Sequence, residues 1–140
     1  MFKDKIITSS PEETKKLGEK IAQGFYPGMV VALLGPLGSG KTCLAQGICS
    51  GLGVKDFVVS PSFVLINEYQ GKYKVYHIDL FRLEKLSEII NLGYEEYFYG
   101  DGVCILEWAE KASTLLPEKR IDIHLKILSE NEREIRIEKF

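Results

Sequence analysis

The stretch that decides the fold of this chain reads Gly35-Pro36-Leu37-Gly38-Ser39-Gly40-Lys41-Thr42. This G-x-x-x-x-G-K-T pattern lets a short loop wrap a polyphosphate with its backbone N–H groups pointing inward, because glycines leave the close approaches free of side chains. Lys41 supplies a point charge for the β- and γ-phosphates, and Thr42 supplies a hydroxyl for Mg²⁺. The following helix adds its positive N-terminal end. We therefore expect a nucleotide to contact Gly35, Leu37, Gly38, Ser39, Gly40, Lys41 and Thr42.

The residues on either side of this loop predict a strand before it and a helix after it. Residues 29–34 form a continuous apolar run, which is typical of a buried parallel strand. Beyond the loop, Leu44, Ile48 and Leu52 recur at helical spacing. Strand, glycine-rich loop and helix in this order are the context that a phosphate-binding loop requires, and they favour it over an ordinary glycine-rich turn.

The composition indicates one small globular domain. We expect residues 1–140 to form a single domain, and 45% of them are hydrophobic, which is enough for a core. The formal net charge of −2 disfavours tight, direct binding of nucleic acid by this chain alone. Lys72, Lys74, Arg82 and Lys85 could form a small positive patch, but an ordinary solvated surface is the simpler interpretation.

Cysteine usage points to a reducing compartment. Cys43, Cys49 and Cys104 are odd in number, lack a C-x-x-C spacing and lie in apolar segments, so we expect buried free thiols. The sequence shows neither a signal peptide nor an apolar run of about 20 residues that could span a membrane. These features predict a cytoplasmic protein with no membrane partner.

The remaining sequence predicts an α/β sandwich with a mixed sheet. A helix begins at Pro11, with Ser10 as N-cap and Glu13 completing a capping box. We expect the buried stripe of that helix to be Leu17, Ile21 and Ala22. Alternation, apolar runs and turn residues predict strands at 4–8, 63–69, 73–79, 103–106, 121–127 and 134–138, and helices at 83–92 and 108–115. Parallel strands near the loop would then be extended by antiparallel hairpins.

Two acids stand where a nucleotide site needs them. Asp79 and Glu107 each follow an apolar strand, and the C-terminal ends of core strands lie beside a phosphate-binding loop. Hydrolysis or transfer requires carboxylates that hold Mg²⁺ and orient the attacking oxygen. We expect one acid to join Thr42 in the metal shell, directly or through water, and the other to position water or lock the first. The alternative is that each acid merely caps a following helix.

Several neighbouring residues leave two interpretations open. His77 lies two residues before Asp79 and so on the same strand face, where it could touch the nucleotide site or a partner, or serve as a hydrogen-bonded core histidine. His124 is expected to be structural or exposed. Trp108 could pack near the nucleotide, although a core or interface aromatic is commoner. Residues 60–63 offer hydroxyls and a rigid turn suited to a loop that senses the γ-phosphate, and an ordinary turn would look the same.

These motifs together resemble the TsaE (YjeE) family of small bacterial P-loop ATPases of tRNA threonylcarbamoyladenosine synthesis. The resemblance rests on residues 35–42, 60–65, 77–82, 92–93 and 107–110, in this order and at this spacing. It implies a three-layer P-loop NTPase-like fold and a Mg²⁺-dependent ATPase that is weak alone. It also implies action with TsaB and TsaD, which threonylcarbamoylate adenosine 37 of tRNA, so that tRNA is met only through that complex.

The resemblance also assigns residues. It implies that Lys41 binds phosphates, that Thr42 and Glu107 are the Mg²⁺ ligands, and that Asp79 is the Walker B-type acid. Glu107, Asp79 and Lys41 would be the catalytic residues, and ATP or ADP would also contact Asp79 and Glu110. The family's two switch segments correspond to residues 60–65 and 77–82. Family members usually have Thr where Ser62 and Val64 stand, Pro at Ala109 and often Tyr at Phe81.

Two other functions stay open on sequence grounds. A small-molecule P-loop kinase would need an acceptor pocket and usually an Arg-bearing lid, and no Arg-rich segment is present. A GTPase would need N-K-x-D, which the sequence lacks. The non-enzymatic alternative is a nucleotide-gated scaffold, whose bound state rather than its turnover matters to a partner.

Overall fold

The computed structural model describes residues 2–59 and 65–140. Within them lie the strands β1 (Phe2–Thr8), β2 (Val30–Leu34), β3 (Ile66–Gln70), β4 (Lys74–Asp79), β5 (Val103–Glu107), β6 (Ile121–Ile127) and β7 (Arg133–Lys139). The helices are α1 (Pro11–Ala22), α2 (Lys41–Gly51), α3 (Leu86–Asn91), α4 (Tyr94–Phe98) and the 3₁₀ helix η1 (Ala109–Ala112). All of these strands belong to one sheet, in the order β1-β7-β6-β2-β5-β4-β3.

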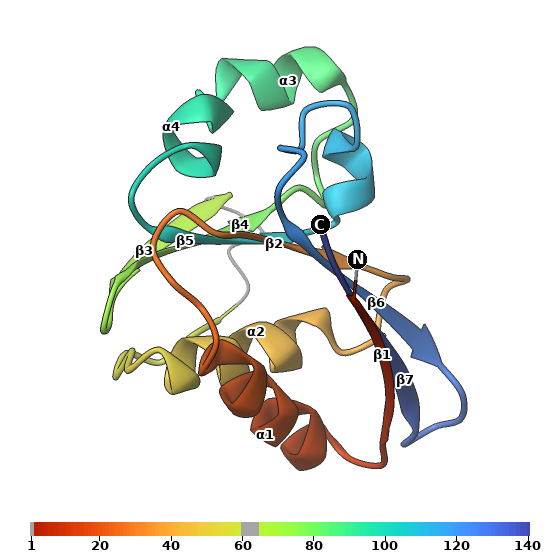
Figure 1. Ribbon diagram of the computed structural model, residues 1–140. Helices are drawn as coiled ribbons and strands as arrows, with labels where there is room; N and C mark the ends of the chain where they lie inside the picture. The colour runs from red at the N-terminus through yellow and green to blue at the C-terminus, as the bar shows by residue number, and fades with distance from the viewer. Residues whose placement is uncertain (1, 60–64) are drawn as a thin grey trace.

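The sheet is mixed, as the sequence predicts. Strands β6, β2, β5 and β4 run parallel in its centre. The hairpins β3–β4 and β6–β7 add antiparallel pairs, and β1 pairs antiparallel with β7 at the far edge. In Figure 1, α1 and α2 cover one face of this sheet, while α3, α4 and η1 cover the other. The expected three-layer α/β sandwich is therefore confirmed.

Strand β2 is apolar throughout because both of its faces are covered. Val31 and Leu33 join a core beneath α2, while Val30 and Ala32 join a second core on the side of α3 and α4. All four are at most 1% exposed. A parallel strand buried in this way needs no polar alternation, which explains the continuous apolar run that precedes the loop.

Helix α1 begins as predicted but buries a different stripe. The Ser10 hydroxyl accepts a hydrogen bond from the Glu13 backbone N–H, and the Glu13 carboxylate accepts one from Ser9 N–H at 2.9 Å. The expected stripe is wrong in part, since Leu17 and Ile21 are only half-buried. The buried residues of α1 are Thr14, Gly18 and Ala22. Small residues face α2 because the two helices pack with their backbones in close contact.

Two predicted helices are shorter than expected. The helix expected over 83–92 spans only Leu86–Asn91, and Gly93, in the left-handed conformation (φ 74°), starts the separate helix α4. The helix expected over 108–115 is a single 3₁₀ turn, because Trp108 also takes a left-handed conformation (φ 60°). The strand expected from residue 63 begins at Ile66, and residues 63 and 64 lie outside the described residues.

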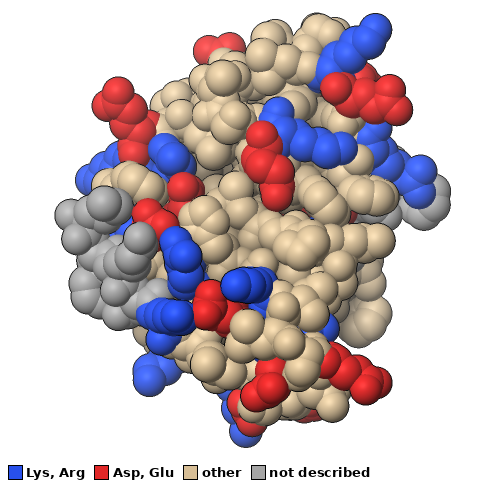
Figure 2. Space-filling model, turned by 90° about the vertical axis from the view of Figure 1, so that its right-hand side faces the viewer, with Lys and Arg blue, Asp and Glu red and all other residues tan. Residues whose placement is uncertain are grey.

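The surface carries both signs of charge. Figure 2 shows Lys and Arg side chains interspersed with Asp and Glu on the face it presents, rather than one continuous basic area. Within residues 2–59 and 65–140, no helix has both the length and the apolarity needed to cross a membrane.

Candidate functional site: a phosphate-binding loop with two buried acids

The loop of residues 35–40 connects β2 to α2, and its backbone requires glycine. Gly40, at φ 99°, is the left-handed N-cap of α2. Gly35 has φ 153°, and a Cβ there would stand 2.5 Å from the Leu125 carbonyl oxygen of the neighbouring β6. A side chain at either position would strain or displace the loop. The glycines of the motif are thus fixed by the fold as well as by access to a phosphate.

Lys41 rests on its own loop. Its Nζ donates hydrogen bonds to the carbonyl oxygens of Gly35 and Pro36, and it lies 3.7 Å from the centroid of the Trp108 ring. Burial lowers the pKa of the Lys41 ammonium, and the nearby carboxylates of Glu110, Glu107 and Asp79 oppose that shift. A phosphate entering the loop would replace the carbonyl partners with charged ones, which are stronger hydrogen-bond acceptors.

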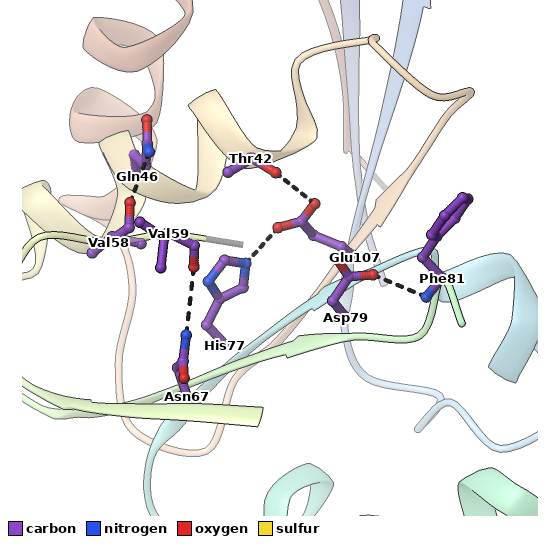
Figure 3. Close-up of polar contacts among 9 residues, drawn as sticks. All are labelled: Thr42, Gln46, Val58, Val59, Asn67, His77, Asp79, Phe81 and Glu107. Atoms are coloured by element: carbon purple, nitrogen blue, oxygen red, sulfur yellow. Dashed lines mark hydrogen bonds and ion pairs between the residues drawn. The ribbon is translucent and has the colours of Figure 1, made fainter. Parts of the chain in front are cut away.

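The two predicted acids lie side by side. Strands β4 and β5 pair in parallel with Asp79 opposite Glu107, and the residues are 3% and 2% exposed. Glu107 accepts a hydrogen bond from the Thr42 hydroxyl on Oε1 at 3.0 Å and contacts His77 Nε2 through Oε2 at 2.5 Å (Figure 3). The sheet therefore brings an acid of β5 onto the first turn of α2, across 65 residues of sequence.

Asp79 has a local role as well. Its Oδ1 accepts a hydrogen bond from Phe81 N–H at 2.9 Å, which shapes the turn that leaves β4. Lys111 of η1 holds the same turn through the carbonyl oxygens of Phe81 and Leu83, at 2.6 and 2.9 Å. Asp79 therefore shapes a turn and does not cap the next helix, α3, whose N-cap is Lys85. Its place opposite Glu107 keeps it at the site.

Glu110 and Trp108 reach the loop from the segment after β5. Glu110 Oε2 accepts a hydrogen bond from Gly35 N–H at 3.3 Å. The Trp108 ring lies under the Lys41 ammonium and packs against Phe81, with ring centroids 5.0 Å apart. The interpretation of Trp108 as a residue near the nucleotide loop is therefore the one that the geometry favours.

A cleft of about 540 Å³ is lined by Lys41, Thr42, Asp79, Glu107 and Trp108. The beginning of α1, which the sequence offers only as a guess for an adenine contact, forms part of its wall through Ser10, Pro11 and Thr14. Sequence reasoning missed another part of the wall, the β6–β7 turn. From that turn Arg133 donates a hydrogen bond to the Gly38 carbonyl oxygen at 3.1 Å. No local motif marks the residues of the β6–β7 turn, and they reach the loop because β6 lies next to β2 in the sheet.

The remaining sequence candidates have different locations. Residues 60–64 fall outside the described residues, and Arg82 lines the cleft. His124 is on β6, outside the lining of the cleft, with a side chain 42% exposed and 3.6 Å from Glu138. Cys49 and Cys104 are buried free thiols, as predicted, whereas Cys43 is half-buried.

The donor set fits a magnesium ion that borrows ligands from a nucleotide. Among the described residues no cluster of three or more His, Cys, Asp or Glu side chains suits a metal. Mg²⁺ in nucleotide sites is held by one or two protein oxygens, phosphate oxygens and water. Thr42 Oγ1 and Glu107 Oε1, 3.0 Å apart, are such a pair. The three carboxylates around Lys41 also give a divalent cation a favourable field.

Comparison with known proteins agrees with the motifs. The family model "Threonylcarbamoyl adenosine biosynthesis protein TsaE" matches residues 8–135. Two relatives are named tRNA threonylcarbamoyladenosine biosynthesis protein TsaE. That of Bacillus subtilis is 44% identical over 129 residues, 91% of this chain and 80% of the relative. That of Treponema pallidum is 36% identical over 133 residues, 95% of this chain and 98% of the relative.

A solved structure resembles the whole fold. The crystal structure of Bacillus subtilis YdiB matches with a TM-score of 0.84 and 38% identity, over 97% of this chain and 84% of that chain. The family model covers well over half of the sequence, and the similar relatives align along nearly all of it. The chain therefore belongs to the TsaE family.

Proposed function

We propose that this protein binds and hydrolyses ATP with Mg²⁺ as a subunit required for threonylcarbamoyladenosine formation in tRNA. The pathway is the one named for its relatives. The observation that carries the ATPase part is the contact between Thr42, at the start of the phosphate-binding loop's helix, and the buried Glu107 on the adjacent strand. It joins a phosphate cradle to the acid that hydrolysis requires.

Each residue then has a defined task. Backbone N–H groups of the loop hold the phosphates, and Lys41 moves from the carbonyl oxygens of Gly35 and Pro36 to the β- and γ-phosphates. Thr42 and Glu107 would hold Mg²⁺, which supplies charge neutralisation at the transferring phosphoryl group. Asp79, buried beside Glu107, orients the attacking water or the metal's water shell.

The partners follow from the family resemblance. We propose that TsaB and TsaD stimulate the weak hydrolysis of this subunit, and that tRNA is reached through their complex in the cytoplasm. The net charge of −2 supports an indirect contact with tRNA, because direct binding of nucleic acid needs a clustered basic face, and the face in Figure 2 carries both signs of charge.

Measurements on purified protein test the proposal. We expect phosphate release from ATP without any acceptor, increased by TsaB and TsaD. Glu107→Gln should still bind ATP but lose about 100-fold or more in turnover, as expected when a positioned charge in the site is removed. Lys41→Ala should bind ATP far more weakly. The matched surface controls Glu118→Gln and Lys16→Ala, both at exposed positions, should behave as the unmodified protein.

The alternatives predict different outcomes. Transfer of phosphate to a metabolite, with no effect of TsaB and TsaD, would point to a small-molecule kinase. Intact tRNA modification by a Glu107→Gln variant that binds but does not hydrolyse ATP would point to a nucleotide-gated scaffold. Unchanged hydrolysis in Glu107→Gln would remove Glu107 from the mechanism.

A further inference from the structure

His77 lies behind the acid of the site and is fully buried. It projects from β4 on the same face as Asp79 and is 0% exposed. The register pairs His77 with Ile105 and Asp79 with Glu107, so the 2.5 Å contact between His77 Nε2 and Glu107 Oε2 runs diagonally across the two parallel strands. Figure 3 shows the imidazole pointing at one oxygen of the carboxylate, while the Thr42 hydroxyl contacts the other.

Both oxygens of the Glu107 carboxylate are therefore held. Oε1 accepts from the Thr42 hydroxyl and Oε2 accepts from the imidazole. An ionised carboxylate is only an acceptor, so the imidazole must carry a proton on Nε2. When Thr42 turns its oxygen toward a metal ion, the contact with His77 is the one that still fixes the orientation of Glu107.

The other ring nitrogen makes no polar contact within the described residues. Nδ1 is buried and has no hydrogen-bond partner there, so the imidazole faces Glu107 with its one satisfied nitrogen. Burying a polar ring among residues such as Val75 and Ile105 costs free energy that an apolar side chain would not cost. A purely space-filling role therefore does not account for a histidine at this position.

We propose that His77 is a positioning residue that sets the orientation of the Glu107 carboxylate toward the magnesium site. This inference rests on the proposed function, in which Glu107 serves the metal-bound nucleotide. Outer-shell partners of metal-binding groups fix the direction of the ligand, and their loss typically costs 10–100-fold in metal affinity or activity. A glutamate released from His77 would have its three side-chain torsions restrained only through Thr42.

The matched pair His77→Gln and His77→Asn tests the geometry. A glutamine amide can place an N–H where Nε2 stands, while the asparagine amide has the same chemistry on a chain one methylene shorter. We expect His77→Asn to raise the Mg²⁺ concentration for half-maximal binding of a non-hydrolysable ATP analogue by about 10-fold or more. Its affinity for metal-free ADP should change less than twofold, and His77→Gln should stay within about threefold of the unmodified protein in both measurements.

Turnover in the same variants should follow Mg²⁺ binding, with kcat falling more than KM changes. In a Glu107→Gln background, adding His77→Asn should cause no further loss, because the two residues act as one unit. Three results would each overturn the proposal. The first is an equal loss of Mg²⁺ binding and turnover in His77→Gln and His77→Asn, and the second is unchanged Mg²⁺ binding in His77→Asn. The third is a loss of turnover in the double variant equal to the sum of the losses in Glu107→Gln and His77→Asn.

A spectroscopic readout does not depend on activity or metal. The chain has two histidines, and His124 is half-exposed, so a slowly exchanging imidazole Nε2–H resonance should belong to His77. We expect Glu107→Gln to shift this Nε2–H resonance and to speed the exchange of its proton with water. A resonance that does not shift would refute the contact between His77 and Glu107. Absence of ATP binding and hydrolysis by the unmodified protein would instead refute the proposed function. Loss of turnover in Glu107→Gln, with Mg²⁺ binding and turnover of His77→Asn unchanged, would refute this inference alone.

Discussion

Replacing Gly47 by alanine tests how the position of the phosphate-binding helix is set. Gly47 lies in α2 where that helix crosses α1, and a Cβ added there would stand 2.1 Å from the Lys15 carbonyl oxygen. Ordinary contact begins at 3.4 Å, so the methyl group is about 1.3 Å too close. The obstacle is backbone inside a helix and cannot rotate away. Helices α1 and α2 must therefore separate.

The magnitude follows from two opposed terms. Alanine gains about 1 kcal/mol over glycine in a helix interior. Overpacking a close contact costs about 3 kcal/mol at the upper end of the usual range. A radial gap of 0.5–1 Å already forfeits a quarter to a half of the dispersion attraction across an interface, which places the cost at that upper end. The net loss is thus about 2 kcal/mol of unfolding free energy, or roughly 6 °C in Tm for a domain of this size.

Urea unfolding followed by circular dichroism measures this loss. Gly24→Ala is the matched control, since the nearest atom to its added Cβ is Ile21 O at 3.9 Å, and it should be neutral or slightly stabilising. Affinity for ADP should fall in Gly47→Ala as well, because Lys41 and Thr42 begin the displaced helix. A Gly47→Ala protein within 0.5 kcal/mol of the unmodified one would refute the close-packing argument.

Further predictions concern the tryptophan and the thiols. The Lys41 ammonium lies 3.7 Å from the ring centroid of Trp108, which is the single tryptophan of the chain. The tryptophan fluorescence should therefore change when ADP draws Lys41 away. The same fluorescence change in a Lys41→Ala protein would contradict this prediction. Burial raises the pKa of Cys49 and Cys104 from 9.0 to about 12. Below pH 9 both thiols are protonated in the folded and in the unfolded chain. Above pH 9 the thiols of the unfolded chain lose their protons, while those of the folded chain keep them until about pH 12. Stability should therefore fall between pH 9 and 12, and more gently in a Cys104→Ala variant, as urea melts would detect. Cys43, the half-buried thiol, should react first with a thiol reagent at pH 8.

The sequence predicts the parts of the site that depend on contiguous residues. The loop and the beginning of α2 follow from the spacing of Gly35, Gly40 and Lys41 alone. The place of Asp79 and Glu107 follows from a rule of parallel sheets, in which strand ends meet at one edge. Local pattern and this general rule suffice for both.

Other parts depend on strand order and on backbone conformations that residue types do not specify. Arg133 reaches Gly38 only because β6 lies beside β2, and no periodicity encodes that neighbourhood. The left-handed conformation of Trp108 shortens a predicted helix and turns the indole under Lys41. A bulky residue rarely adopts this conformation, so pattern reasoning extends the helix through it.

His77 shows why two interpretations of one residue can both hold. It is a hydrogen-bonded core histidine, and its partner is the acid of the site. The sequence separates the two residues by 30 positions, and only the register of β4 and β5 makes them diagonal neighbours. The apolar core and the proposed nucleotide site share this part of the sheet, so burial of His77 and the positioning role proposed for it are compatible.

The charged side chains of the site already have polar or aromatic partners in the absence of a nucleotide. Lys41 lies on carbonyl oxygens and an indole, Glu107 on a hydroxyl and an imidazole, and Glu110 on the Gly35 N–H. Binding ATP must exchange these contacts for phosphate and metal contacts, so only the difference between the two sets contributes to affinity and catalysis. If the proposed ATPase activity holds, this exchange is a physical reason to expect slow hydrolysis by the isolated chain.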